Sequence, residues 1–309
     1  MQIGFVGLGR MGAYMVARIR RDSDHAVVAF DPDKRAQEVA FEYGARAVTS
    51  LESLVNGLKP PRTVWLMVPA GEITQQTVDA LAGLLEEGDT VVDGGNSKWT
   101  EDTARAEMLA AKGIQYVDVG VSGGVWGLTE GYCMMVGGPE EAVERLRPIL
   151  DVLAPPATEQ HGPGWGHLGP TGSGHYVKMV HNGIEYGLMQ AYAEGFDLFD
   201  KAPFELDNAK IAHLWMQGSV VRSWLCELAA SAFEQEGDDL AGLSGYTADS
   251  GEGRWTIEEA MDRDVPTPVI TAALYARFYS RDNGDFTHRV LSALRAQFGG
   301  HATKPSADG

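Results

Sequence analysis

The chain opens with MQIGFVGLGRMG, residues 1–12, and this stretch decides the fold of its first half. Residues 1–7 are a short apolar run typical of a buried parallel strand, and residues 13–20 continue with helical periodicity. Between them stands the pattern G-x-G-x-x-G, whose glycines permit a tight turn and let backbone N–H groups approach a pyrophosphate at a helix N-terminus. We therefore expect a nicotinamide dinucleotide to bind at Gly7, Leu8, Gly9, Arg10, Met11 and Gly12.

A second apolar run, residues 26–30, is followed by Asp31, 19 residues beyond Gly12. An acidic side chain at this distance accepts hydrogen bonds from the adenosine ribose hydroxyls, and its charge repels a 2′-phosphate. Lys34 and Arg35 follow closely, either as solvated residues of the next helix or as cations that weaken this preference. We expect NAD as the cofactor, with NADP as the alternative.

Two further strand ends bring residues to the edge of the sheet where the cofactor binds. Residues 63–68 form a buried strand that ends in Val68, and Pro69 follows it at the edge where ligands of doubly wound sheets bind. Residues 90–93 form the next strand and lead into Gly-Gly-Asn-Ser. Asn96 in this loop offers both a donor and an acceptor, and we expect Val68, Pro69 and Asn96 to contact the cofactor.

The next strand, residues 116–119, leads into a glycine-rich loop that contains Ser122, Gly123 and Gly124. Such a loop is often a plain turn. Its place after a strand that ends beside the cofactor favours another role, in which the hydroxyl and the backbone N–H groups bind an anionic oxygen of a substrate.

Strands and helices alternate to about residue 160, with a βα step at residues 44–48 that ends at the helix cap Ser50 and another strand at 133–137. This alternation predicts an α/β, Rossmann-type parallel sheet. Residues 161–174 are rich in Gly and Pro and are expected to form a linker and a turn. An all-α domain follows, with Asp207 and Ser223 as helix caps. We predict a dinucleotide-binding domain at residues 1–165 and a substrate and oligomerisation domain at 166–309, with helices at 176–201, 208–218, 223–236, 256–264, 267–281 and 286–298.

Composition narrows the class of partner. The chain has 309 residues and a formal net charge of −18, which disfavours nucleic acid as a partner because phosphate backbones need clustered Lys and Arg. Cys133 and Cys226 are the only cysteines, so neither a disulfide framework nor a structural zinc site is expected. The N-terminus lacks the pattern of a signal peptide, and no apolar run approaches the length of a membrane span. We expect a cytoplasmic protein.

The stretch GSGHYVKMVHNGIEYG, residues 172–187, concentrates the candidate chemistry. Lys178, His181, Asn182 and Glu185 are spaced i, i+3, i+4 and i+7, so a helix places them on one face. The apolar residues between them can supply the packed side: Val177, Met179, Val180 and Ile184. An ordinary surface helix is the alternative, but the mixture of a base, an acid and two neutral hydrogen-bonding groups favours a functional face.

Four histidines lie close together in sequence, His161, His167, His175 and His181. They lack the spacing to carboxylates that metal-binding motifs show, and we expect no metal site.

Several motifs together resemble those of the 6-phosphogluconate dehydrogenases, the decarboxylating members of the β-hydroxyacid dehydrogenase superfamily. They are GFVGLGRMG at 4–12, GGNS at 94–97, VSGG at 121–124, KMVHNGIEYG at 178–187, YAR at 275–277 and RAQFGGH at 295–301. The resemblance spans the chain, whose length is that of the short form of the family, often NAD-dependent and oligomeric. It implies oxidative decarboxylation of 6-phospho-D-gluconate to D-ribulose 5-phosphate in the pentose phosphate pathway, by a homodimer or homotetramer.

The resemblance also implies roles for individual residues. Lys178 matches the general base and Glu185 the general acid. The residues that match substrate ligands are Asn96, Ser122, Gly123, Gly124, His181, Asn182, Tyr186 and Arg277, together with Arg295 and His301, which the family supplies from a neighbouring subunit.

The chain departs from the family at SGEGRW, residues 250–255, where the long forms have a KGTGKW-like run. Ser250 and Glu252 replace a Lys and a Thr that contact the substrate phosphate. Glu252 would repel a phosphate, so we expect either that it points away or that the phosphate binds differently, with Arg254 as a compensating cation.

The chemistry suits these residues. Lys178 would accept the hydroxyl proton at C3 while hydride passes to the nicotinamide. The 3-keto acid then loses CO2, the protonated Lys178 stabilises the enolate oxygen, and Glu185 protonates C1. The alternatives are a non-decarboxylating β-hydroxyacid dehydrogenase and, in another class, a catalytically inactive dinucleotide-binding regulatory protein.

Overall fold

A computed structural model of the chain describes residues 1–282 and residue 287. The chain divides into two compact units, Met1–His181 and Asn182–Gly309. The predicted helix 286–298 and the predicted ligands Arg295 and His301 lie outside the described residues. The predicted domain boundary at residue 165 stays a prediction.

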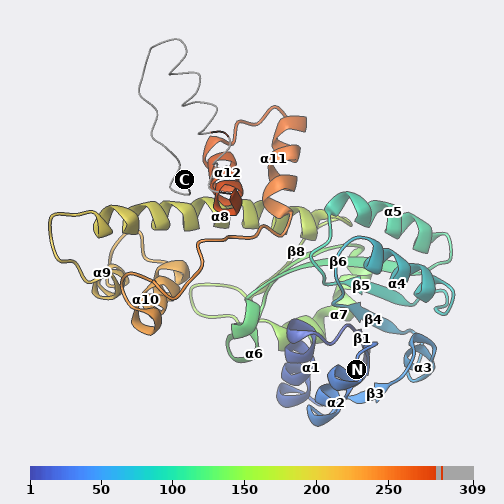
Figure 1. Ribbon diagram of the computed structural model, residues 1–309. Helices are drawn as coiled ribbons and strands as arrows, with labels where there is room; N and C mark the ends of the chain where they lie inside the picture. Colours follow the sequence, from blue (N-terminus) through green and yellow to red (C-terminus); the bar gives the residue numbers. More distant parts are fainter. Residues whose placement is uncertain (283–286, 288–309) are drawn as a thin grey trace, which may run out of the picture. The chain divides into compact units, whose positions relative to one another are not determined.

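The first unit is built on an eight-stranded sheet with the order β3-β2-β1-β4-β5-β6-β7-β8 (Figure 1). Its first six strands run parallel and follow the order 3-2-1-4-5-6 of a dinucleotide-binding fold. The Rossmann-type fold predicted from the sequence is confirmed. The strands are β1 (Gln2–Val6), β2 (Ala26–Phe30), β3 (Arg46–Val48), β4 (Thr63–Leu66), β5 (Thr90–Asp93), β6 (Gln115–Ser122), β7 (Cys133–Gly137) and β8 (Trp165–Gly169).

Two features at the far edge of the sheet differ from the sequence prediction. The expectation of a wholly parallel sheet is wrong at β7, which runs antiparallel to β6. The expectation of a linker over residues 161–174 is wrong for Trp165–Gly169, which forms β8 and pairs parallel to β7. The short helices η1 (Gly124–Trp126) and α6 (Gly127–Glu130) are the only elements between β6 and β7. The segment 123–132 has too few residues for a crossover to a parallel strand.

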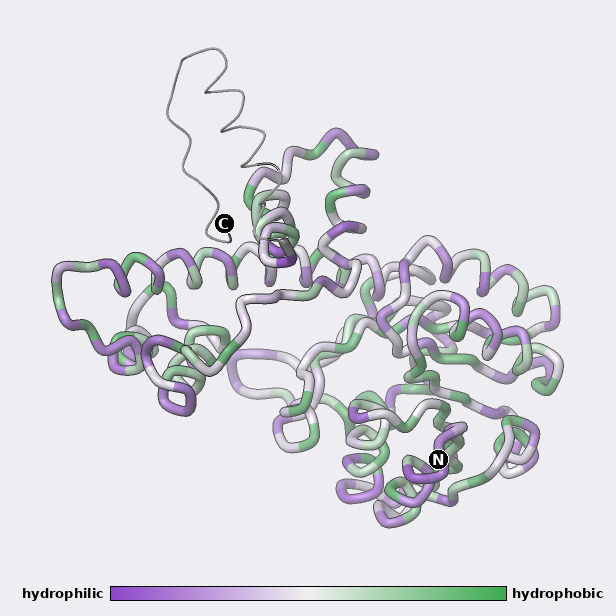
Figure 2. The backbone as a smooth tube through the Cα atoms, viewed as in Figure 1, coloured by the Kyte–Doolittle hydropathy of each residue, from purple (hydrophilic) through white to green (hydrophobic). Residues whose placement is uncertain are grey.

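Helices cover both faces of the sheet and bury two apolar layers. The strands carry alternate apolar residues into each layer and appear mainly green in Figure 2. One layer contains residues of α1 (Arg10–Asp22), α2 (Lys34–Glu42) and α7 (Glu140–Leu153). The opposite layer contains residues of α3 (Leu51–Asn56), α4 (Glu72–Ala82) and α5 (Trp99–Ala110). Ser50 caps α3 through its side chain, as predicted.

The long helix α8 (Ser173–Asp200) begins against β6 and β7 at very short range. A Cβ added at Gly120 in β6 would lie 2.3 Å from Cβ of Lys178. A Cβ added at Gly174 would lie 2.4 Å from the carbonyl oxygen of Met135 in β7. Glycine at both positions therefore lets the helix backbone approach the sheet backbone. The first turn of α8 is fixed by the Asp118 carboxylate, which accepts hydrogen bonds from the N–H groups of Gly172 (2.7 Å) and His175 (2.9 Å).

The packed side of α8 is not the apolar side that the sequence suggested. Val177 is 39% exposed and Ile184 is 52% exposed, whereas His175 and Lys178 are buried. The expectation that Val177 and Ile184 are packed is therefore wrong, although Met179 is buried. The buried face of the first turns is polar because carboxylates of the sheet and of α5 face it.

Up to residue 282, the second unit contains the rest of α8 and four helices: α9 (Asn208–Trp215), α10 (Trp224–Glu236), α11 (Glu252–Asp262) and α12 (Pro268–Asp282). Helices α8, α9 and α10 share one apolar cluster around Phe196 and Phe233. Helices α8, α11 and α12 share another around Tyr186 and Leu274. Asp207 and Ser223 cap α9 and α10 as predicted. Helix α11 begins four residues before the predicted position. None of the helices in the described part of the chain combines the length and apolarity that crossing a membrane requires.

Replacing Gly120 by Ala should lower the free energy of unfolding by about 1–3 kcal/mol, because the new methyl group overlaps Cβ of Lys178. Urea denaturation at neutral pH measures this change. Gly162→Ala is the matched control, since a Cβ there meets no atom within 4 Å. An unchanged unfolding midpoint for Gly120→Ala would contradict the close contact between β6 and α8.

Candidate active site

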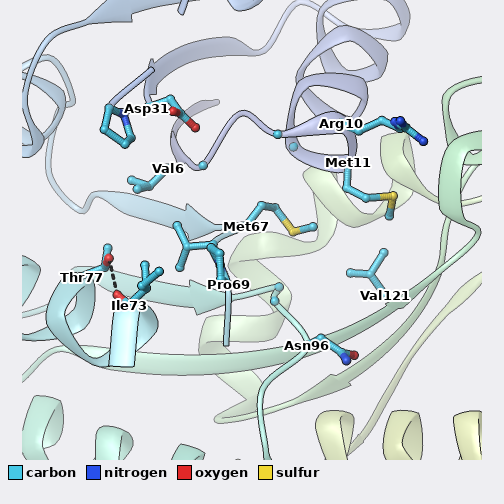
Figure 3. A pocket seen from close by; sticks show the side chains of 17 residues that line it. Val6, Arg10, Met11, Asp31, Met67, Pro69, Ile73, Thr77, Asn96 and Val121 are labelled. Carbon is cyan, nitrogen blue, oxygen red and sulfur yellow. Dashed lines mark hydrogen bonds between the residues drawn. The ribbon is translucent and has the colours of Figure 1, made fainter. Parts of the chain in front are cut away.

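A cavity of about 740 Å³ opens at the carboxyl ends of β1 and β4, where the strand order reverses direction. Its floor is formed by the loops after β1, β2, β4 and β5 (Figure 3). The cavity brings together most of the residues predicted to bind the cofactor: Gly7, Gly9, Arg10, Met11, Gly12, Asp31, Val68, Pro69 and Asn96. In Figure 3, Asp31 and Asn96 lie toward opposite sides of this cavity, with Met67 between them.

The glycine-rich loop has the close backbone approach that its sequence implied. Gly7 has a φ of +91°, and a Cβ there would lie 2.4 Å from the carbonyl oxygen of Met67. A Cβ at Gly12 would lie 2.0 Å from the carbonyl oxygen of Gly7. Side chains at either position would break the turn, so the loop can present backbone N–H groups to a pyrophosphate only with glycine here.

Asp31 connects this loop to the loop after β2. One carboxylate oxygen accepts the N–H of Leu8 at 2.7 Å, and the other accepts the N–H of Asp33 at 2.8 Å. Leu8 itself is buried and does not line the cavity; its role is to pack and to donate this hydrogen bond. Lys34 and Arg35 are exposed residues in the first turn of α2, as one of the two interpretations of the sequence had it.

Sequence reasoning missed part of the cavity lining. Met67, Ile73, Thr77 and Val121 contribute side chains to it. Met67 directly follows β4, Val121 is the last residue but one of β6, and Ile73 and Thr77 lie on α4, so none of them belongs to a recognisable binding motif. An apolar wall of this kind suits the flat rings of a dinucleotide.

The loop that carries Asn96 is held in place by hydrogen bonds to the buried carboxylate of Asp93. One oxygen of Asp93 accepts the N–H of Gly95 at 3.0 Å, and the other accepts the Ser97 hydroxyl at 2.7 Å. The second oxygen also lies 3.4 Å from the buried guanidinium of Arg105. Asn96 therefore stands on a loop whose two neighbours are fixed by one side chain.

The same carboxylate belongs to a buried polar cluster that reaches α8. The Tyr116 hydroxyl lies within hydrogen-bonding distance of Asp93 (3.0 Å) and of Asp102 (2.9 Å). The other oxygen of Asp102 pairs with Nδ1 of His175 at 2.8 Å. Within the described residues, Asp93, Asp102 and His175 are the one group of ligand atoms close enough for a metal ion. Arg105, Tyr116 and Ser97 already engage these carboxylates, which makes the cluster a hydrogen-bonded ion-pair network.

Burial and charge act in opposite directions on this pair. Burial raises the pKa of Asp102 to about 6, although His175 opposes the shift. Burial alone would lower the pKa of His175, but the charge and hydrogen bond of Asp102 outweigh it and raise that pKa to about 10. Between these values both groups are ionised, so the first turn of α8 is held by a buried ion pair as well as by Asp118.

Lys178 lies one turn after His175 and is 8% exposed. It packs against Gly120 of β6, which pairs with Met135 of β7. Burial raises the pKa of the Cys133 thiol, and the positive charge of Lys178 opposes that shift. Ser122 ends β6 and is half-buried, so the expectation of a loop from Gly120 onward is wrong for its first three residues. Gly123 follows with a φ of +132°, and the exposed Gly124 begins η1.

The remaining described candidates lie on α8, between His181 and Tyr186, and on α12. His181, Asn182 and Glu185 are half-buried on α8. Tyr186 is 5% exposed, and the guanidinium of Arg277 lies 3.5 Å from the centre of its ring. Arg277 also donates to the carbonyl oxygen of Ala248 at 2.8 Å. Tyr186 and Arg277, 91 residues apart in sequence, are thus brought together by α8 and α12.

Comparison with known proteins identifies both parts of the chain. The family model described as "NAD binding domain of 6-phosphogluconate dehydrogenase" matches residues 2–162, and the model described as "6-phosphogluconate dehydrogenase, C-terminal domain" matches residues 174–303. The chain is 45% identical over 302 residues to an NAD(+)-dependent, decarboxylating 6-phosphogluconate dehydrogenase of Haloferax volcanii, with 97% of this chain and 98% of the relative covered.

Longer relatives match as well. The decarboxylating 6-phosphogluconate dehydrogenase of Escherichia coli is 34% identical, with 96% of this chain and 65% of the relative covered. The solved structure of the Plasmodium falciparum 6-phosphogluconate dehydrogenase superposes with a TM-score of 0.83 at 28% identity, covering 100% of this chain and 67% of that one. That structure was described in complex with NADP+ and with 6-phosphogluconate.

Replacing Asp102 by Asn should lower the free energy of unfolding by about 3–5 kcal/mol at pH 6.5, because it leaves His175 buried without its charge partner. The pKa of His175 is raised in the folded state, so its contribution is complete below its unfolded pKa and is lost as pH rises toward about 10. Urea denaturation of both proteins between pH 6.5 and 10 should show the difference shrinking.

Glu101→Gln is the control for this experiment. Glu101 pairs with Arg105 in the same network, but its side chain is 41% exposed, so its loss should cost no more than about 1 kcal/mol. A difference between wild type and Asp102→Asn that stays constant from pH 6.5 to 10 would contradict a charged His175.

Proposed function

The chain belongs to the 6-phosphogluconate dehydrogenase family, and from this we propose that it oxidises and decarboxylates 6-phospho-D-gluconate to D-ribulose 5-phosphate and CO2, with reduction of NAD. The observation that carries the proposal is the match of both family domains along one chain that aligns from end to end with an NAD(+)-dependent relative. Lys178 and Glu185, the residues that the chemistry requires, are both present on α8.

The cavity at the ends of β1 and β4 fits a dinucleotide on three grounds. Gly7 and Gly12 leave room that a Cβ would fill, the loop opens α1 at its N-terminus, and Asp31 stands at the end of β2. When NAD is bound there, its nicotinamide supplies the acceptor for the hydride. Asn96 stands on the loop after β5, where we propose that its amide meets both the nicotinamide and the substrate.

We assign the base to Lys178. Its buried amine would accept the proton of the substrate C3 hydroxyl as hydride leaves C3. The resulting 3-keto acid carries its carboxylate β to the carbonyl. As the bond between C1 and C2 breaks, electron density moves to the carbonyl oxygen, and the protonated Lys178 stabilises the developing enolate.

We assign the acid to Glu185, which lies two helical turns beyond Lys178 on α8. It would protonate the enediol carbon that carried the carboxylate, which is C2 of the sugar acid and C1 of the product, to give the ketose. Ser122, Gly123 and Gly124 would bind the substrate carboxylate, and His181 and Asn182 its hydroxyl groups. Tyr186 and Arg277 would bind the phosphate, with Arg295 and His301 supplied by a second copy of the chain. We also propose that the chain forms a homo-oligomer and acts in the cytoplasm.

Replacing Lys178 by Met should lower kcat at least about 1,000-fold, because both the proton acceptor and the enolate partner are lost. NADH formation at 340 nm and trapped CO2, measured together with 6-phosphogluconate, test the proposal. NAD affinity, followed by fluorescence titration, should stay near that of wild type. Wild-type NADH formation without CO2 would instead identify a non-decarboxylating dehydrogenase, and near-normal turnover of Lys178→Met would remove the base assignment.

Asp31 should control the choice of cofactor. Asp31→Asn removes the charge that repels a 2′-phosphate and keeps an oxygen for the Leu8 N–H. We expect the ratio of kcat/KM for NAD to that for NADP to fall by about tenfold, which corresponds to ~1.4 kcal/mol. Asp24→Asn is the control. Asp24 is an exposed carboxylate before the amino end of β2, whereas Asp31 follows its carboxyl end, so this variant should leave the ratio unchanged. An unchanged ratio in Asp31→Asn would show that another residue sets the preference.

A further inference from the structure

We propose that Glu252 positions Asn182 for the substrate, and that it does not contact the substrate phosphate. This inference rests on the function proposed above and concerns a residue that departs from the family pattern. Glu252 is the first residue of α11 and is 3% exposed. Its carboxylate accepts a hydrogen bond from the side-chain amide of Asn182. The residue that looked repulsive in the sequence is therefore directed at a predicted substrate ligand.

The carboxylate is held in place by a short chain of hydrogen bonds. The Ser250 hydroxyl lies 3.3 Å from the same Glu252 oxygen that meets Asn182. The N–H of Ser250 donates to the Tyr186 hydroxyl at 3.2 Å, and the two hydroxyl groups lie 3.5 Å apart. One chain of hydrogen bonds thus runs from Asn182 through Glu252 and Ser250 to Tyr186. The guanidinium of Arg277 covers the ring of Tyr186. Both residues of the departure, Ser250 and Glu252, belong to this one network.

Helices α8 and α11 are closely packed around the Glu252–Asn182 pair. A Cβ added at Gly253 would lie 2.5 Å from the ring of Tyr186. A Cβ added at Gly183 would lie 2.7 Å from the side chain of Thr256. Glycine at both contacts brings the two helices to backbone distance around the Glu252–Asn182 pair. Gly251, with a φ of +97°, makes the turn that starts α11 at this point.

The chemistry of the pair gives Asn182 a defined orientation. A carboxylate only accepts hydrogen bonds, whereas an amide has a donor end and an acceptor end. Glu252 therefore fixes which end of Asn182 faces α11 and directs the carbonyl oxygen away from it. A carbonyl oxygen oriented in this way can accept a hydrogen bond from a hydroxyl group of a sugar acid. The neutral amide of Asn182 would repel neither a phosphorylated nor an unphosphorylated sugar acid.

The compensating cation expected at Arg254 is otherwise engaged. Its guanidinium lies 3.0 Å from the Asp249 carboxylate and 4.4 Å over the ring of Phe278. Arg281 contacts the same Asp249 carboxylate. Arg254 and Arg281 therefore stabilise the segment before α11, which carries Ser250 and leads into Glu252. The residues that depart from the family pattern, Ser250 and Glu252, therefore orient Asn182, and Arg254 does not contribute to that role.

The test is a double-mutant cycle on steady-state kinetics. Glu252→Ala should raise KM for 6-phosphogluconate about tenfold or more, with a smaller change in kcat and none in KM for NAD. In an Asn182→Ala background the same substitution should add no further increase in KM. Glu252→Gln, whose side-chain oxygen can still accept from Asn182, should restore KM to within about threefold of wild type. Asp262→Ala, an exposed carboxylate in the last turn of α11, is the control.

Each outcome separates the inference from the function on which it rests. If wild type oxidises neither 6-phosphogluconate nor D-gluconate, the proposed function fails and the inference falls with it. If wild type is active and Glu252→Ala lowers KM for 6-phosphogluconate but not for D-gluconate, Glu252 repels phosphate and the positioning role is wrong. Equal effects of Glu252→Ala with and without Asn182 would also overturn it. NAD titration and urea denaturation show whether each variant is folded. If Glu252→Ala does not fold, Glu252→Asp and Glu252→Gln decide the question. The shorter side chain of Glu252→Asp leaves its carboxylate farther from Asn182, so KM should rise in Glu252→Asp and not in Glu252→Gln.

Discussion

The Asp118 carboxylate is the contact on which the arrangement of the first unit depends. It is fully buried in β6 and accepts the backbone N–H groups of Gly172 and His175, so it binds the N-terminus of α8 to the sheet. A negative charge is favourable there because the first N–H groups of a helix lack partners and carry partial positive charge. The same helix carries Lys178, so the position of the proposed base is set by a carboxylate 60 residues earlier in the chain.

A second layer of buried charge makes this position rigid. Asp93 holds the Asn96 loop, Asp102 holds His175, and Tyr116 and Arg105 join the two carboxylates. Burying several ionised groups is costly unless each is paired and hydrogen-bonded. Here the pairing connects the loop beside the cofactor cavity with the helix of the proposed base. Although burying these charges costs stability, the network fixes the geometry of the site. A reaction that removes a hydride from a carbon and a proton from its hydroxyl group requires such fixed geometry.

The sequence predicted those features that depend on neighbours along the chain. The glycine fingerprint, the strands before it and after it, and the caps Ser50, Asp207 and Ser223 all follow from local rules. The errors concern partners distant in sequence. Strand β8 has Gly at two of its five positions and exposed side chains, so it lacks the pattern of a buried strand. The buried face of α8 was misassigned because its polar residues meet carboxylates from β6 and α5, which no periodicity within residues 172–187 reveals.

Glu252 shows the same dependence for a single residue. Beside a phosphate its charge would be repulsive, and sequence alone could only compare it with the residue found in relatives. In the folded chain its partners are the amide of Asn182 and the hydroxyl of Ser250, both of which donate hydrogen bonds to its carboxylate. Asp118 and Glu252 thus act alike: each is a buried carboxylate that fixes one part of α8, the first through backbone N–H groups and the second through a side chain. The candidate residues of this helix derive their positions from acids on its neighbours, so the helix sequence alone identifies them but does not orient them.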